Sequence, residues 1–172
     1  PVSSEKQIVR LSWSAIGDTL DKSHSIATLI SVGATRQKVW FNLPSTAALP
    51  LQIRLYPDNR SGLLRLFSVH VFSNQGDQQH LVKAITGGHE IAHAAVLHGL
   101  TFEGDLEHDV FVVVDKEPHL TWTIDTTTPT ATNDTISVVI EMDWTRSTEF
   151  AFLTNMFFKW IDRALALTAQ LE

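Results

Sequence analysis

The segment from Leu51 to Phe72, LQIRLYPDNRSGLLRLFSVHVF, decides what kind of fold the chain can form. In its first six residues a leucine or isoleucine occupies every second position, and this period of two places alternate side chains on opposite faces of a strand. A second β-prone run begins at Leu63. Between the two, PDNRSG combines a proline, which fixes φ, with Asp, Asn and Gly, which favour turns. The segment is therefore predicted to form a β-hairpin.

Shorter stretches with the same period surround this segment. Strands are expected over residues 38–43, 110–115, 120–124 and 136–143. Residues 25–32 fit either a last helical turn or a first strand, and the alternation of their apolar residues favours the strand. The chain should therefore contain an antiparallel sheet of five to seven strands.

A helical period is present near the N-terminus. Apolar residues recur at spacings of four, three and four from Val9 to Leu20, which places them on one face of a helix. Ser4 and Gln7 fit a capping box, in which the two side chains satisfy backbone donors at a helix start. An amphipathic helix is predicted from Ser4 to about Asp21.

A second helix is predicted from Asp77, which can cap it, to about His98, with Gly99 at the stop position. Small residues fall on one face, so this helix could lie close against the sheet. Gly87 and Gly88 would together cost about 2 kcal/mol in helix propensity. Either the helix begins after them, or close packing offsets the cost.

The final segment has the longest helical pattern. Ser147 can cap it, and apolar residues that include Phe150, Phe157 and Trp160 keep a spacing of three or four to the end of the chain. A helix of more than twenty residues is predicted. Its apolar side is wider than one stripe, which indicates either a second copy of the chain as partner or a deeper intramolecular core.

The composition limits the function classes. The 172 residues, 44% of them hydrophobic, suit one domain over 1–172. The formal net charge is −6 and no two basic residues are adjacent, which argues against nucleic acid or an anionic membrane as partner. The lack of cysteine excludes disulfides, thiolate nucleophiles and cysteine metal sites. No apolar run spans a bilayer and no signal-peptide pattern is present, so a cytoplasmic protein is expected.

One string carries a named chemistry. His89-Glu90-Ile91-Ala92-His93 places two histidines one helical turn apart, where they could bind one zinc ion while Glu90 activates its water. Residues 86–99 resemble the zincin metallopeptidases over about fifteen residues. The longer zincin motif departs at Val96 and Gly99, and nothing in the sequence selects a third ligand. The alternative is a packed helix flanked by two histidines, with no cofactor.

Two tryptophans, Trp40 and Trp122, occupy strand positions. An aromatic side chain there serves either as a binding surface or as core. Both alternatives remain open, and both residues are candidates for a partner surface together with Phe150, Phe157 and Trp160.

The order helix, strands, helix, strands, long helix resembles the fold of class I type III secretion chaperones and the related YbjN-type domains. The resemblance rests on topology and patterning. It implies an α+β fold with N-terminal, central and C-terminal helices on an antiparallel sheet, a homodimer, and binding of an extended segment of a client protein. The expected function is thus a non-enzymatic protein-binding module. The alternatives are a zinc-dependent metallohydrolase and a structural subunit of a larger assembly.

Overall fold

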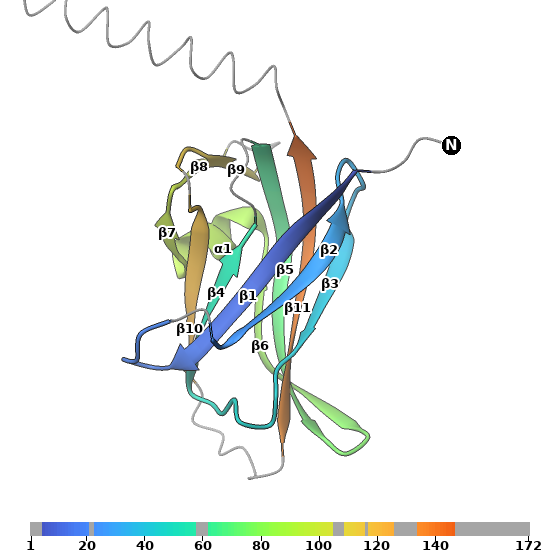
Figure 1. Cartoon of the computed structure of the whole chain (residues 1–172), viewed down its shortest axis with the longest axis vertical. Helices are drawn as coiled ribbons and strands as arrows, with labels where there is room; N and C mark the ends of the chain where they lie inside the picture. Colours follow the sequence, from blue (N-terminus) through green and yellow to red (C-terminus); the bar gives the residue numbers. More distant parts are fainter. Residues whose placement is uncertain are drawn as a thin grey trace, which may run out of the picture.

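The fold is built from two antiparallel β-sheets that face each other, as the computed structural model shows (Figure 1). The structure describes residues 5–20, 23–57, 62–104, 109–115, 117–125 and 134–146. These residues form eleven strands and one short helix. The first sheet, sheet A, has the order β2-β1-β4-β10-β7. Its strands are β1 (Lys6–Ala15), β2 (Ser25–Ser31), β4 (Leu51–Tyr56), β7 (Val96–His98) and β10 (His119–Ile124).

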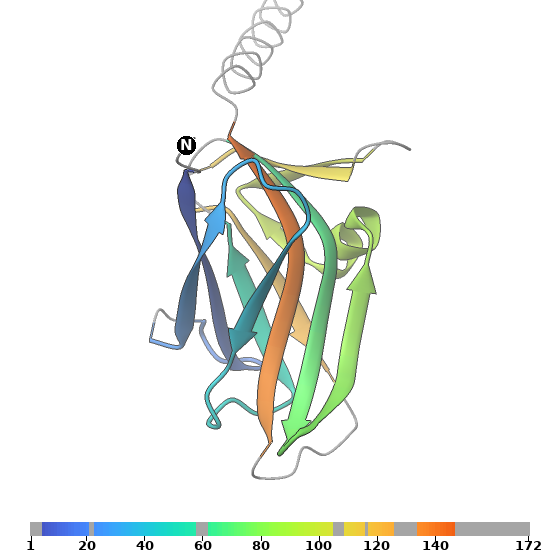
Figure 2. The same cartoon turned by 90° about the vertical axis from the view of Figure 1, so that its right-hand side faces the viewer.

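The second sheet, sheet B, has the order β3-β11-β5-β9-β8, and β6 also pairs with β5. The long strand β5 pairs with β9 through its first residues and with β6 through its second half. Figure 2 shows β11, β5 and β6 side by side. The strands are β3 (Gln37–Asn42), β5 (Gly62–Gln75), β6 (Gln78–Thr86), β8 (Leu100–Gly104), β9 (Asp109–Val113) and β11 (Thr135–Arg146).

The core lies between the sheets because alternate residues of each strand point inward. From sheet A, Leu11 and Ile53 are fully buried, and from sheet B, Val138 and Ile140 are fully buried. Trp122 belongs to the same buried cluster. The alternation read from the sequence is therefore the pattern that builds the core.

The expected α+β class, with one antiparallel sheet of five to seven strands, is wrong. The described chain forms two antiparallel sheets and is all-β apart from the helix α1 (Gly88–Ala94). The predicted N-terminal helix is strand β1. Val9, Leu11 and Trp13 alternate and are buried there, whereas Ile16 lies beyond the strand and is 44% exposed. The helical spacing was misleading because residues four apart, such as Val9 and Trp13, lie on the same face of a strand as well as on the same face of a helix.

The predicted central helix is also wrong over most of its length. Its first part is strand β6, its last part is strand β7, and only α1 between them is helical. The helix begins directly after Gly87, which has φ of 86°. The helix therefore begins within the glycine pair, with Gly88 as its first residue, and the predicted start after both glycines is wrong by one residue.

The strands predicted on either side of PDNRSG are confirmed, but the hairpin is wrong. β4 pairs with β1 and β10 in sheet A, whereas β5 belongs to sheet B. The connection therefore crosses between the sheets. Of residues 25–32, Ser25–Ser31 form strand β2, as their alternation favoured. The predicted C-terminal helix lies outside the described residues, and within them no helix is long and apolar enough to cross a membrane.

Sheet A ends at a short pairing between β10 and β7, which contains two facing histidines. His119 lies opposite His98, and the imidazole rings stack with centroids 4.6 Å apart. Burial lowers the pKa of His119 below the ordinary 6.5, and the hydrogen bond with the Glu117 carbonyl opposes this only in part. The charges of Arg54 and His98 lower the pKa further, while that of Glu117 raises it.

We expect this histidine to make the stability of the fold depend on pH. The unfolded chain binds the proton more readily than the folded chain, so the His119 contribution is complete above pH 6.5 and is lost as the pH falls below that value. The free energy of unfolding, measured with urea at pH values above and below 6.5, should fall more steeply with decreasing pH for the wild type than for His119→Gln. His80→Gln, at an exposed position on β6, is the control and should keep the wild-type slope. Equal slopes for wild type and His119→Gln would contradict the assignment.

Candidate binding site

The histidines of the HEIAH string lie on α1 and are exposed. The backbone N–H of His89 donates to Asp109 Oδ2 at 3.0 Å, and Glu90 Oε2 accepts from the N–H of Thr86 at 3.2 Å. Both contacts fix the start of the helix. Among the described residues no group of three or more His, Asp or Glu could hold one metal ion. A third ligand could also come from elsewhere in the sequence, from Glu103, Glu107, His108 or Glu149, and the last three of these lie outside the described residues.

The two tryptophans proposed for a partner surface have opposite environments. Trp122 is 1% exposed, and its Nε1 donates to the carbonyl of Ile91 at 3.4 Å, so it is a core residue. Trp40 is 52% exposed on strand β3. The other three candidates, Phe150, Phe157 and Trp160, lie outside the described residues, and the homodimer inferred from them stays a prediction.

Trp40 belongs to a continuous apolar surface on the outer face of sheet B. Val139 of β11 lies between Trp40 and His70 of β5, paired with one on each side. Phe72, two residues after His70, pairs with Leu81 of the edge strand β6. The side chain of Leu81 is 57% exposed. We call these five residues, from four adjacent strands, the aromatic platform.

The aromatic rings of the platform contact one another. The rings of Trp40 and Phe72 are nearly parallel, with centroids 6.5 Å apart and planes 15° apart. His70 meets Phe72 edge-on at 6.1 Å. Trp40 of β3 can reach Phe72 of β5 across β11, because β11 places the small side chains of Ser137 and Val139 between them on this face. The platform therefore offers a group of contacting aromatic side chains, partly exposed, against which an apolar group can pack.

A row of hydrogen-bonded polar side chains borders the platform. Asn74 Nδ2 donates to Ser137 Oγ at 2.8 Å, and Ser137 Oγ donates to Asn42 Oδ1 at 2.8 Å. Gln79 Nε2 extends the row by donating to Asn74 Oδ1 at 3.1 Å. This network spans β3, β11, β5 and β6, so it holds the strands beneath the platform in a fixed register. It also places amide groups beside the apolar area.

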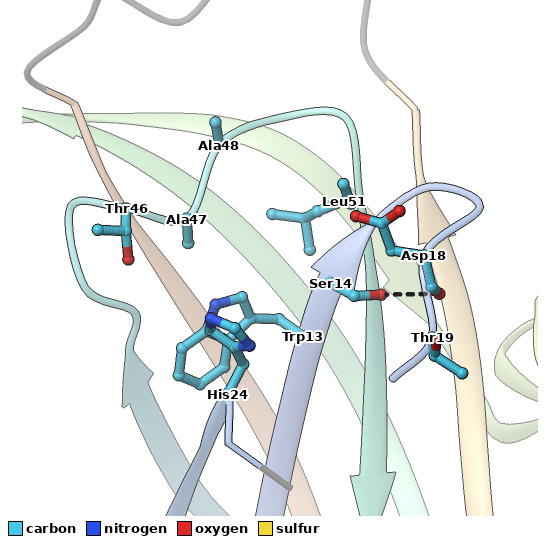
Figure 3. A pocket seen from close by; sticks show the side chains of 10 residues that line it. Trp13, Ser14, Asp18, Thr19, His24, Thr46, Ala47, Ala48 and Leu51 are labelled. Atoms are coloured by element: carbon cyan, nitrogen blue, oxygen red, sulfur yellow. Dashed lines mark hydrogen bonds between the residues drawn. The ribbon is translucent and has the colours of Figure 1, made fainter. Parts of the chain in front are cut away.

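A separate pocket of about 400 Å³ lies at one end of the sandwich, between the β1–β2 and β3–β4 connections (Figure 3). The rings of Trp13 and His24 meet edge-to-face with centroids 6.0 Å apart, and Thr46 and Ala47 of the other connection lie across from them. The volume falls within the usual range for small-molecule sites. Its lining mixes one indole and small apolar groups with the polar side chains of Ser14, Asp18, Thr19, His24 and Thr46.

The local chain explains the shape of this pocket. The Asp18 N–H donates to the Ala15 carbonyl at 3.1 Å, and Ser14 Oγ donates to the Asp18 carbonyl at 3.5 Å, so the β1–β2 connection turns back over the end of β1. Hydroxyl, carboxylate and imidazole groups around an indole suit a small polar ligand. Trp13 is 7% exposed, however, so little of its ring is open to a ligand.

Comparisons of the chain with protein-family models, with curated proteins and with solved structures find no match. The function must therefore be argued from the residues alone. The chaperone resemblance rested on an order of helices and strands that differs from the observed order, so it adds nothing to that argument. Of the features behind the zincin resemblance, the described structure retains the exposed His89 and His93 and the intervening Glu90 on one helix.

Sequence reasoning found Trp40 but missed its neighbours on the platform. Phe72 and Leu81 stood in stretches predicted as a strand and as a helix, with no signal that they faced solvent. In the sheet formed by the described residues, β11 lies between β3 and β5, and it comes much later in the chain than either. A prediction of strand β6 would have revealed part of the surface, because Leu81 then pairs with Phe72 across a hairpin.

Proposed function

We propose that this protein is a non-enzymatic binding module that recognises a segment of a partner protein through the aromatic platform. The observation that carries the proposal is the exposed Trp40 stacked in parallel on Phe72 beside the exposed Leu81. Single exposed apolar residues are common on soluble proteins, but a contiguous patch usually marks an interaction site. Aromatic anchors of this kind contribute much of the affinity at protein interfaces.

The edge of sheet B supports the same proposal. β6 is a strand of nine residues, and among the described residues it pairs with β5 alone. An extended segment could add to this edge by backbone hydrogen bonds and place its alternate side chains over Leu81 and Phe72. A bulge between Val71 and Phe72 interrupts the β5–β6 register, and bulges of this kind limit unselective pairing at sheet edges.

The side chains of the platform suit contact and not bond-making. They supply apolar area and a border of amides, with His70 as the titratable member. The amides can hydrogen-bond to the backbone of a bound segment, while the stacked rings bury its apolar side chains. This division of roles favours a binding module over an enzyme at this surface.

A displayed library of extended peptides tests the proposal. Peptides selected on the wild-type protein should be apolar or aromatic, and Trp40→Ala should weaken their binding at least about tenfold, since the anchor of an interface carries a large share of the affinity. The indole resonance of Trp40 should shift on binding. The free energy of unfolding should change little, because the side chain is half exposed.

Lys38→Ala is the matched control, because Lys38 is also exposed on β3, two residues before Trp40 on the same face. It should leave peptide affinity unchanged. Peptides that bind Trp40→Ala and Phe72→Ala as well as the wild type would contradict the proposal. A glycan array forms the second arm: Trp40-dependent binding of sugars in place of peptides would make the partner class wrong.

A further inference from the structure

Sheet A is free of acidic residues in all five of its strands. Its strand sequences contain Lys6, Arg10, Arg54, His98 and His119 and no Asp or Glu. The chain as a whole has 19 acidic residues against 13 basic ones. The fold therefore gathers positive charge on one face of an acidic protein.

These basic side chains share the outer face of the sheet. The inward positions of β4 and β10, including Leu55 and Leu120, are fully buried, so Arg54 and His119 project from the opposite side. Arg10 lies directly opposite Tyr56 in the β1–β4 register. Tyr56 meets the His119 ring at 5.3 Å.

His119 in turn pairs with His98. We call Arg10, Tyr56, His119 and His98, which run across four strands, together with Arg54 beside them, the cationic row.

Arg54 is held in place by neutral partners. Its Nε donates to Thr121 Oγ1 at 3.0 Å, and its Nη1 donates to the Tyr56 hydroxyl oxygen at 3.4 Å. Since that oxygen accepts from Arg54, the phenolic proton of Tyr56 can be donated outward. The guanidinium keeps its full charge and has further N–H donors for a ligand.

The arginines of the row are free of acidic partners within the described residues. Neither Arg10 nor Arg54 forms a salt bridge there, whereas Arg36, directly before β3, is paired with Glu141 of β11 at 3.2 Å. Two guanidinium groups and a phenol converging on one face provide the donors that an oxyanion requires.

We propose that the cationic row binds the oxyanion group of a small ligand, a carboxylate or a tetrahedral phosphate-like group, seated over Tyr56 between Arg10 and Arg54. His119 and His98 border this site, so their imidazole N–H groups can add donors at its edge. The groups that face His119 are Arg54 and Tyr56 from β4, His98 from β7 and Glu117 from the preceding connection. The Glu117 carboxylate opposes anion binding but is exposed at the rim. This site is on the sheet opposite the aromatic platform, and it stands independently of the proposed function.

Titration with sulfate and with formate, followed by NMR at constant ionic strength, tests the inference. Both ions keep one charge state between about pH 5.5 and about pH 7.5, so any change in affinity reports on the protein. Saturable shifts are expected at Tyr56 and at the ring protons of His119 and His98. Affinity should rise as the pH falls, by roughly threefold where His119 gains a proton near the anion.

Three variants distinguish a specific site from non-specific electrostatic attraction of the anions. Arg54→Gln should weaken binding about tenfold through loss of charged hydrogen bonds. Arg10→Gln should weaken anion binding by a similar factor. It leaves the hydrogen bonds of Arg54 to Thr121 and Tyr56 in place, so it tests the site even if Arg54→Gln misfolds. Arg65→Gln removes the same charge from an exposed position on sheet B and should keep full affinity.

The outcomes decide both the site and its ligand class. Tighter sulfate binding assigns a phosphate-like group, tighter formate binding assigns a carboxylate, and equal binding assigns an oxyanion of either kind. Shifts that fail to saturate, or losses equal in Arg54→Gln and Arg65→Gln, would overturn the proposal.

Discussion

Replacing Trp122 with alanine should lower the free energy of unfolding by about 3–5 kcal/mol, the usual cost of removing a buried aromatic side chain. The residue is 1% exposed and is among the largest fully buried side chains of the described chain. Its loss would leave a cavity between the sheets and would remove the indole donor from the Ile91 carbonyl, which ties the core to α1. The two losses act together, so the upper part of this range is expected.

Urea unfolding with Trp40→Ala as the matched control measures this effect. Both variants lose one tryptophan from a strand, but Trp40 is 52% exposed, and its removal should change the free energy of unfolding by less than about 1 kcal/mol. Binding should respond in the opposite order, with Trp40→Ala the more damaging. Similar destabilisation by the two variants would contradict the assignment of Trp122 to the core and Trp40 to the surface.

These two tryptophans also show where sequence reasoning stops. Each stands in a strand with alternating neighbours, so the local pattern predicts the strand correctly. The pattern leaves the inward face undecided where both faces carry apolar residues: Trp40 is flanked by Val39 and Phe41, and these two are the buried ones. Which set points inward depends on the second sheet, and that is a property of the whole fold.

The same limit explains the wrong fold class. Strands β1 and β6 contain apolar residues that also satisfy helical spacings, and β6 is an edge strand with mostly exposed side chains. Edge strands need few buried residues, so their alternation is weak. Pairing with β5 over the length of β6, seen only in the structure, decides the conformation of residues 78–86.

The candidate sites were still harder to foresee. The platform joins residues of β3, β5, β6 and β11, and the cationic row joins residues of β1, β4, β7 and β10. No two basic residues are adjacent in the sequence, so the sequence gives no sign of a basic surface. The fold assembles the row by placing the single basic residues of separate strands on the same face.

Gly88→Ala tests the contact that positions α1, and the expected sign is opposite to that of helix propensity. Alanine in a helix is favoured over glycine by about 1 kcal/mol. A Cβ at position 88 would meet the Cβ of Asp109 at 2.5 Å and its Cγ at 3.1 Å. The clash should displace the carboxylate that accepts from the His89 N–H, and a net destabilisation of about 1–3 kcal/mol is expected.

A double-mutant cycle with Asp109→Gly isolates that contact. The second substitution removes the atoms that clash, so the double variant should lose less stability than the sum of the single variants. Ala94→Gly, at the exposed end of α1, reports propensity alone and should cost at most about 1 kcal/mol. If Gly88→Ala instead stabilises the protein, the glycine is only a weak helix former and the close approach of α1 to β9 is wrong. If it destabilises and the cycle shows coupling, Gly88, directly before the HEIAH string, allows the helix to pack onto β9. The positions of the neighbouring His89 and Glu90 then depend on that packing.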